Sequence, residues 1–191
     1  MRKLIPEKNN TVLSGDFMTM AEALRQSGYR TCHVGKWHLG DGEHTSPEGQ
    51  GFDVNIAGNH SGHPAGGYFS PYKNPQLEDG PKGEYLTDRL TDEALTFIEE
   101  QKNDPFFLYF AHYAVHTPIQ AKAEYTEAYL GKTDDRGQDN ATYASMIQST
   151  DESLGRLIEK LDELDIAENT LVVFFSDNGG LGHVTSCLPL K

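Results

Sequence analysis

The spacing of apolar and polar positions predicts three helices that alternate with three strands. Apolar residues three and four positions apart predict helices over 16–26, 85–102 and 140–164. Short runs rich in apolar and β-branched residues predict strands over 29–34, 106–111 and 171–175. A helix that connects one strand to the next favours parallel pairing of those strands. The pattern therefore predicts an α/β fold in which helices flank a mostly parallel sheet.

The flanking residues refine this outline. Ser14 or Asp16 is a candidate N-cap for the first helix, and Gly28 is its expected stop. The second and third strands are continuous apolar runs, which predicts burial on both faces of the sheet. The stretch 40–83 is rich in Gly, Pro, Asn, His and Ser and has little periodicity, so we expect a long loop there.

Composition excludes some classes of partner. The 191 residues carry a formal net charge of -13, which opposes binding to a nucleic-acid backbone. The sequence has no apolar run of membrane-spanning length and no signal-peptide core at its start, so we expect no membrane partner. Cys32 and Cys187 are too few for a disulfide framework, and no pattern predicts an oligomeric state.

Polar side chains with chemical potential follow each predicted strand. Lys36 and His38 come after the first strand and point the same way if the backbone stays extended. His116 follows the second strand, in a turn that precedes a proline. Asp177 and Asn178 follow the third and offer hard oxygen ligands suited to calcium or magnesium. Because the carboxyl ends of parallel strands meet at one edge, the joint pattern predicts a single site.

The motifs resemble those of a known enzyme family. Residues 28–40 read GYRTCHVGKWHLG and closely resemble the second signature of type I sulfatases, G-Y-x-T-x-x-x-G-K-W-H-L-G. Residues 114–118, 143–155 and 175–180 resemble further sulfatase motifs, in the family's order. The resemblance covers essentially the whole chain. It implies the sandwich fold of the alkaline phosphatase superfamily, with 1–191 forming an incomplete sulfatase catalytic domain.

The resemblance also implies roles for the strand-end residues. Lys36 and His116 would contact the sulfate, and His38 would lie beside the nucleophile. Asp177 and Asn178 would ligate Ca²⁺, with Mg²⁺ as a second possibility. Either histidine could protonate the departing alcohol, and we favour His116.

Two further histidines and one absent motif complete the picture. His60 and His63, in the long loop, are candidates for binding the alcohol or sugar part of a substrate, against the alternative of a plain exposed loop. Sulfatases make a formylglycine nucleophile within C/S-x-P-x-R, upstream of the G-K-W-H motif, and 1–29 contain no such motif. The stretch 187–191, CLPLK, imitates it but follows Asp177 and resembles a different sulfatase loop, so we reject it as the nucleophile.

The implied function is hydrolysis of sulfate monoesters, of a sulfated carbohydrate or an aryl ester, by a full-length parent. By itself this chain is expected to be nearly inactive, without a nucleophile. The alternatives are a phosphonate or phosphodiester hydrolase of the same superfamily and a non-catalytic protein that binds sulfated glycans. A small-molecule or glycan sulfate ester is the expected partner, and the parent is expected in the periplasm, outside the cell or in lysosomes.

Overall fold

The computed structural model describes residues 10–133 and 137–187. Predictions made on 1–9 and on 188–191, including most of the CLPLK look-alike, lie outside the described residues. The elements in chain order are α1 (Met20–Gln26), β1 (Arg30–Gly35), β2 (Val54–Ile56), α2 (Leu86–Glu100), β3 (Phe106–Ala111), α3 (Ala123–Tyr129) and α4 (Ala141–Glu163), with short 3-10 turns at Glu48–Gln50 and Ala167–Asn169. Within the described ranges, no helix is long and apolar enough to cross a bilayer.

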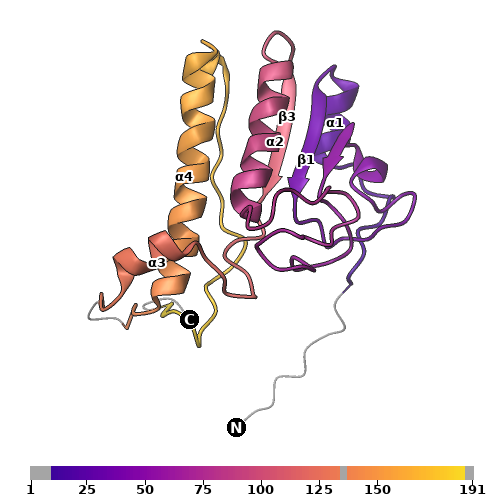
Figure 1. Cartoon of the computed structure of the whole chain (residues 1–191). Coiled ribbons are helices and arrows are strands. Elements are labelled where there is room, and N and C mark those ends of the chain that lie inside the picture. The colour runs from indigo at the N-terminus through magenta and orange to yellow at the C-terminus, as the bar shows by residue number, and fades with distance from the viewer. Residues whose placement is uncertain (1–9, 134–136, 188–191) are drawn as a thin grey trace.

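The sheet is parallel throughout, as the sequence predicts. Its strand order is β2-β1-β3, and β1 pairs with both neighbours in parallel. The register of β1 and β3 runs from Arg30 opposite Phe106 to Gly35 opposite Ala111, so both strands end at the same level. The prediction of a parallel sheet flanked by helices is confirmed, and Figure 1 shows the loops gathered below the carboxyl ends of the strands.

One face of the sheet packs against α2 and forms the main core. Every second residue of the strands turns toward this helix, including Cys32 and Val34 from β1. The predicted apolar stripe of α2 is buried there: Leu86, Leu90, Ala94, Phe97 and Ile98. α4 packs beside α2, where a buried hydrogen bond of 2.6 Å joins the hydroxyls of Thr91 and Ser153. The helices at 85–102 and 140–164 are therefore confirmed as elements, and Met146 of α4 belongs to the same core, although the predicted apolar face of α4 leaves Ile147 49% exposed.

The other face of the sheet carries a smaller aromatic cluster. Ala21 of α1 packs there with Trp37 and Phe52, and the Phe52 ring stacks on Phe107 of β3 at 6.0 Å. Coverage of this face is incomplete, because Tyr109 of β3 is 46% exposed. The expectation that β3 is buried on both faces is thus wrong for this residue, since α1 is too short to cover the whole face.

The start of α1 differs from the expected N-cap. The side chain of Thr19 accepts from the backbone N–H of Glu22, and the Glu22 carboxylate accepts from the N–H of Thr19. This reciprocal capping box stops the helix from starting earlier. Ser14 and Asp16 instead hydrogen-bond to each other ahead of the helix.

Two elements were not predicted. β2 has only three residues, within the glycine-rich stretch that was expected to be a loop, and it exists because β1 offers it a backbone partner. α3 has no buried residue among its seven, and a helix without a buried apolar face has no stripe in its sequence that would predict it. Both depend on tertiary neighbours more than on local pattern.

The prediction of a third strand over 171–175 is wrong. Residues 171–175 form no strand, and exposure of their side chains runs from 49% for Val172 to 89% for Leu171. In Figure 1 the chain after α4 returns toward the carboxyl ends as an irregular trace and not as an arrow. An extended apolar run becomes a strand only where a neighbour supplies hydrogen-bonding partners, and among the described residues none pairs with this run.

Burial of His33 makes stability depend on pH. Its side chain is fully buried on the aromatic face, and this burial lowers its pKa from 6.5 to about 4. Between these pH values the unfolded chain binds more protons than the folded one, so the free energy of unfolding falls as pH drops. We expect a loss of about 2 to 3 kcal/mol from this residue between about pH 7 and pH 4.5.

Urea unfolding at the two pH values checks this expectation. His33→Leu removes the titrating group, so its free energy of unfolding should fall less on acidification than that of the unmodified chain. An equal fall in both proteins would show that His33 does not contribute.

Candidate functional site

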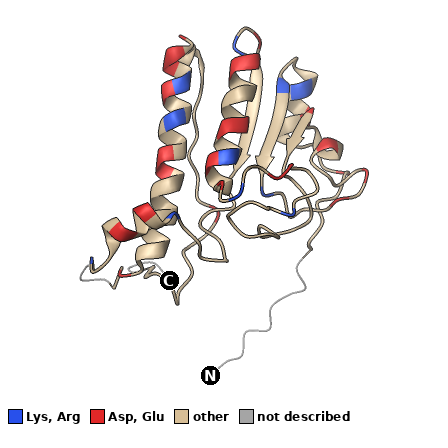
Figure 2. Cartoon of the chain, in the orientation of Figure 1, with Lys and Arg blue, Asp and Glu red and all other residues tan. Residues whose placement is uncertain are grey.

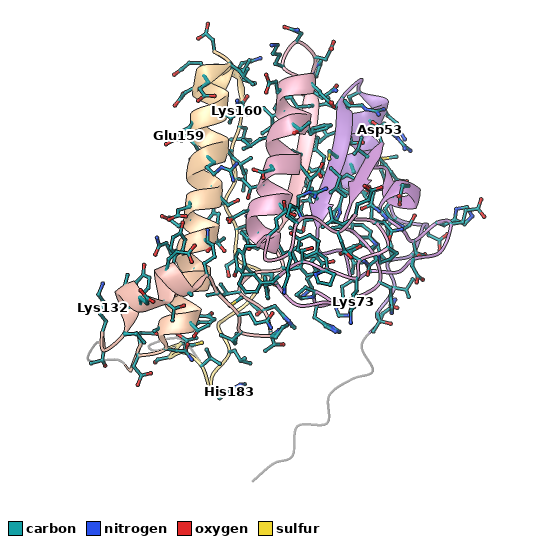
Figure 3. The ribbon with its side chains drawn as sticks, viewed as in Figure 1. Asp53, Lys73, Lys132, Glu159, Lys160 and His183 are labelled. Carbon is teal, nitrogen blue, oxygen red and sulfur yellow. The ribbon has the colours of Figure 1, made fainter. Side chains whose placement is uncertain are left out.

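The predicted site residues from the first two strands lie at the carboxyl edge of the sheet. Lys36 directly follows β1, and His116 follows β3 after a short turn. The opposite edge is marked by Asp53, which accepts from the backbone N–H of Thr31 at the start of β1. Figure 3 shows Asp53 near that edge and Lys73 within the loop layer below the carboxyl ends. The polar residues that follow β1 and β3 therefore share one end of the molecule.

A close contact between β1 and β3 fixes the position of Lys36. The backbone N–H of Lys36 donates to the carbonyl of Ala111 at 2.8 Å. Gly35 has φ of +102°, and a Cβ atom there would lie 2.0 Å from the same carbonyl oxygen. Only glycine fits both the backbone conformation and the contact. The half-buried Lys36 thus leaves the sheet at a defined point, beside the segment that leads to His116.

His38 is placed by a turn and not by strand alternation. Its φ is +62°, so the backbone is not extended there, and the expected geometric reason for pairing it with Lys36 is wrong. Its backbone N–H donates to the carbonyl of Asn59 at 3.0 Å. The imidazole lies on Gly62, where a Cβ atom would come within 2.5 Å of the ring. The long polar loop is therefore packed against His38.

The histidines of the polar loop lie near His38. The ring centroids of His38 and His60 are 6.1 Å apart. Partial burial, followed by the charge of Lys36 and by smaller effects of His60, His116 and His63, lowers the pKa of His38. The four other side chains predicted to bind substrate or act on it are thus each within electrostatic reach of His38. Figure 2 shows basic residues in this loop layer, whereas acidic residues recur along α2 and α4.

The turn that carries His116 is held by a buried tyrosine. The hydroxyl of Tyr68 lies 2.7 Å from the carbonyl of Tyr113 and 2.9 Å from that of His116, so it can donate to either. Nδ1 of His116 lies 2.9 Å from the carbonyl of Thr117. A carbonyl can only accept, so this contact requires the proton on Nδ1. The exposed ring then has Nε2 available to exchange a proton.

The predicted metal ligands do not complete a metal site. Asp177 and Asn178 are both exposed. Among residues 10–133 and 137–187, no three His, Cys, Asp or Glu side chains are arranged to hold a metal ion. Calcium requires six to eight oxygen ligands, so these two residues alone do not fit the ion. Asp177 and Asn178, which follow the third predicted strand, therefore do not form a complete metal site with other described residues. Calcium binding stays a prediction.

Sequence reasoning missed the residues that support the site. Tyr68 and Asn59 hold the backbone of His116 and His38, and His33 contacts the backbone of Lys36. The contacts of Tyr68 and Asn59 leave no spacing pattern, because they join residues far apart in the sequence. Only the central position of His33 in an otherwise apolar strand could have marked it.

Comparison with known proteins identifies the family. The sulfatase family model matches residues 4–184, which is nearly the whole chain. The chain belongs to the sulfatase family. It is 34% identical over 184 residues to an arylsulfatase of Hemicentrotus pulcherrimus, covering 85% of this chain and 31% of the relative. It is 35% identical over 182 residues to the N-acetylgalactosamine-6-sulfatase of Homo sapiens, covering 84% and 32%.

Solved sulfatase structures share the fold. The crystal structure of Ps i-CgsB in complex with k-i-k-neocarrahexaose matches with a TM-score of 0.78 and 33% identity, covering 96% of this chain and 45% of that one. A putative sulfatase, yidJ from Bacteroides fragilis, matches with a TM-score of 0.62 at 22% identity, covering 83% of this chain and 43% of that one, and shows the fold alone. This sulfatase chain thus spans about a third of the length of the curated relatives named above.

The contact of Gly35 with Ala111 predicts a large cost for a small substitution. Gly35→Ala should lower the free energy of unfolding by at least about 3 kcal/mol, because backbone strain is combined with a clash against a carbonyl. Gly28→Ala is the matched control. Gly28 also has positive φ, at +90°, but nothing lies within 4 Å of its Cβ position. Strain alone should cost about 1 kcal/mol there. Equal losses in urea unfolding would contradict a special role for the contact.

Proposed function

We propose that this chain forms the sulfate-binding part of a sulfatase active site, and that the whole protein hydrolyses sulfate monoesters. The observation that carries the proposal is the gathering of Lys36 with His38, His60, His63 and His116 at the carboxyl edge of the sheet. A chain of net charge -13 would repel a sulfate ester unless its cations were concentrated at one place. Family membership supports the choice of sulfate among the possible anions.

Lys36 is proposed to hold the sulfate by charge. Its backbone is fixed to β3 through Ala111, so the side chain starts from a defined point beside the segment that leads to His116. A charge-assisted hydrogen bond to a sulfate oxygen is about twice as strong as a neutral one. Charge develops on the leaving oxygen in the transition state, and a fixed cation stabilises it without reorganisation.

His116 is proposed as the proton donor to the departing alcohol. Because Nδ1 carries the proton donated to Thr117, Nε2 has a proton to transfer only when the ring is the doubly protonated imidazolium, and this form is the proposed acid. The lowered pKa of His38 reduces its protonated fraction near neutral pH, which argues against His38 as the acid. His38 is then a neutral hydrogen-bonding partner beside the reacting group.

The substrate is proposed to be a sulfated carbohydrate, with an aryl sulfate as the simpler possibility. The relatives' names include N-acetylgalactosamine-6-sulfatase, and one matching structure contains a neocarrahexaose. His60 and His63 lie in the exposed loop beside His38, a position that suits contact with the alcohol or sugar part. Such a parent would act in the periplasm, outside the cell or in lysosomes.

Residues 1–191 alone are proposed to bind sulfate esters with little or no turnover. They contain no C/S-x-P-x-R sequence to supply a formylglycine nucleophile. Asp177 and Asn178 would contribute to a calcium site only together with ligands from elsewhere in a full-length protein.

Binding of inorganic sulfate tests the proposal. Lys36→Gln removes the charge while keeping length, and should weaken sulfate binding about 10- to 100-fold in titration calorimetry. Lys102→Gln is the matched control, because Lys102 is an exposed lysine in the turn between α2 and β3, at the opposite edge of the sheet. Equal affinity in the two variants would contradict an anion site at Lys36. Stronger binding of phosphate than of sulfate would favour a phosphonate or phosphodiester hydrolase.

A calcium titration tests the metal assignment separately. Affinity depends on ligand number and charge, so this chain should bind Ca²⁺ with a dissociation constant of about 1 mM or weaker. Tight binding that is abolished by Asp177→Asn would contradict the expectation that the site is incomplete within these residues.

A further inference from the structure

A buried histidine contacts the backbone of Lys36 from inside the sheet. His33 of β1 is fully buried, and its Nε2 lies 3.2 Å from the carbonyl oxygen of Lys36. Its other ring nitrogen, Nδ1, lies against Gly58, where a Cβ atom would come within 2.6 Å. Nδ1 forms no hydrogen bond of normal geometry with a described residue. The side chain of Asn55 also lies near the ring and favours its protonated form, but among the described residues the contact with Lys36 is the hydrogen bond of normal geometry that this ring makes.

The surroundings of His33 are aromatic and hold the ring in one orientation. The Trp37 ring meets it edge-on at 5.3 Å, and the Phe52 ring does so at 5.4 Å. Tyr109 of β3 lies at 5.7 Å. A polar ring in such a place costs free energy unless a hydrogen bond offsets it. Leucine would fill the space without this cost, so packing alone does not explain a histidine here.

The tautomer of His33 follows from its partner. A carbonyl oxygen can only accept, so Nε2 must carry the proton that it donates to Lys36. Burial also lowers the pKa of His33, so the ring stays neutral near pH 7 and does not repel the nearby lysine. The neutral ring with its proton on Nε2 meets both requirements.

We propose that His33 is a positioning residue for anion binding: by donating from Nε2 to the carbonyl of Lys36, it fixes the backbone from which the Lys36 side chain reaches the anion. Lys36 is then held on both sides of its Cα atom. Its N–H is fixed by Ala111 of β3, and its carbonyl is fixed by His33. This inference rests on the proposed function, in which Lys36 contacts the sulfate.

Two substitutions separate positioning from packing. His33→Leu keeps the volume and loses the donor, and should weaken binding of inorganic sulfate about tenfold. His33→Gln retains an N–H donor and should stay within about threefold of the unmodified chain. Phe52→Leu is the matched control, because Phe52 packs on the His33 ring without a hydrogen bond to Lys36. Equal weakening by His33→Leu and Phe52→Leu would reduce His33 to a packing residue and overturn the proposal.

Nuclear magnetic resonance gives readouts that need no anion. The ¹⁵N signals of His33 should report a neutral ring with its proton on Nε2 near pH 7, and a proton on Nδ1 would overturn the proposal. The ¹³C signal of the Lys36 carbonyl should shift between the unmodified chain and His33→Leu, or between His33→Leu and His33→Gln. The same signal should not shift in Phe52→Leu. These spectra also keep the proposal testable if His33→Leu does not fold, because the tautomer is measured on the unmodified chain.

The outcomes distinguish the two proposals. If the unmodified chain shows the expected tautomer but binds no sulfate, the proposed function fails, and the positioning role of His33 fails with the proposed function. The contact of His33 with Lys36 would then be a structural contact only. If the chain binds sulfate through Lys36 but His33→Leu binds it equally well, the positioning role alone fails.

Discussion

The last residue pair in the register of β1 and β3 is the constraint on which the site depends. Gly35 lies opposite Ala111, and the absence of a side chain lets the two backbones approach until Lys36 donates to the Ala111 carbonyl. Both candidate catalytic segments leave the sheet from this point. A shift of register or an added methyl group would move Lys36 relative to His116, although neither residue would itself be altered.

The loop layer below the sheet brings histidines close to the point that this constraint fixes. Asn59 and Gly62 hold His38 by its backbone and its ring, and Tyr68 holds the turn of His116. Most of these contacts are made to backbone atoms, so they leave the imidazoles available to a ligand. The result is a local concentration of cationic and titratable groups on a strongly acidic chain, which is the arrangement that recognition of an anionic ester requires.

Local pattern predicted the elements that own a clear apolar stripe or run. The helix at 85–102 and the strands at 29–34 and 106–111 are confirmed. Their apolar side chains pack against one another in the same core, so each element has the neighbours that its pattern requires. The run at 171–175 has the same composition but lacks a strand partner among the described residues, so composition alone misled. β2 shows the converse, since three unremarkable residues pair because β1 lies beside them. Lys36, His38 and His116 followed from family motifs, and His60 and His63 followed from their place in the polar loop. The backbone contacts of His33 and Tyr68 arise from the folded arrangement.

The proposed function depends on one anion site at the carboxyl edge of β1 and β3. A crystal structure of this chain soaked with selenate, a heavier analogue of sulfate, tests for this site most directly, because anomalous scattering locates the anion without reference to any assumed site. We expect selenate within hydrogen-bonding distance, about 3 Å, of both Lys36 Nζ and His116 Nε2. Selenate bound elsewhere on the chain, with Lys36 and His116 left without it, would contradict an anion site at this edge.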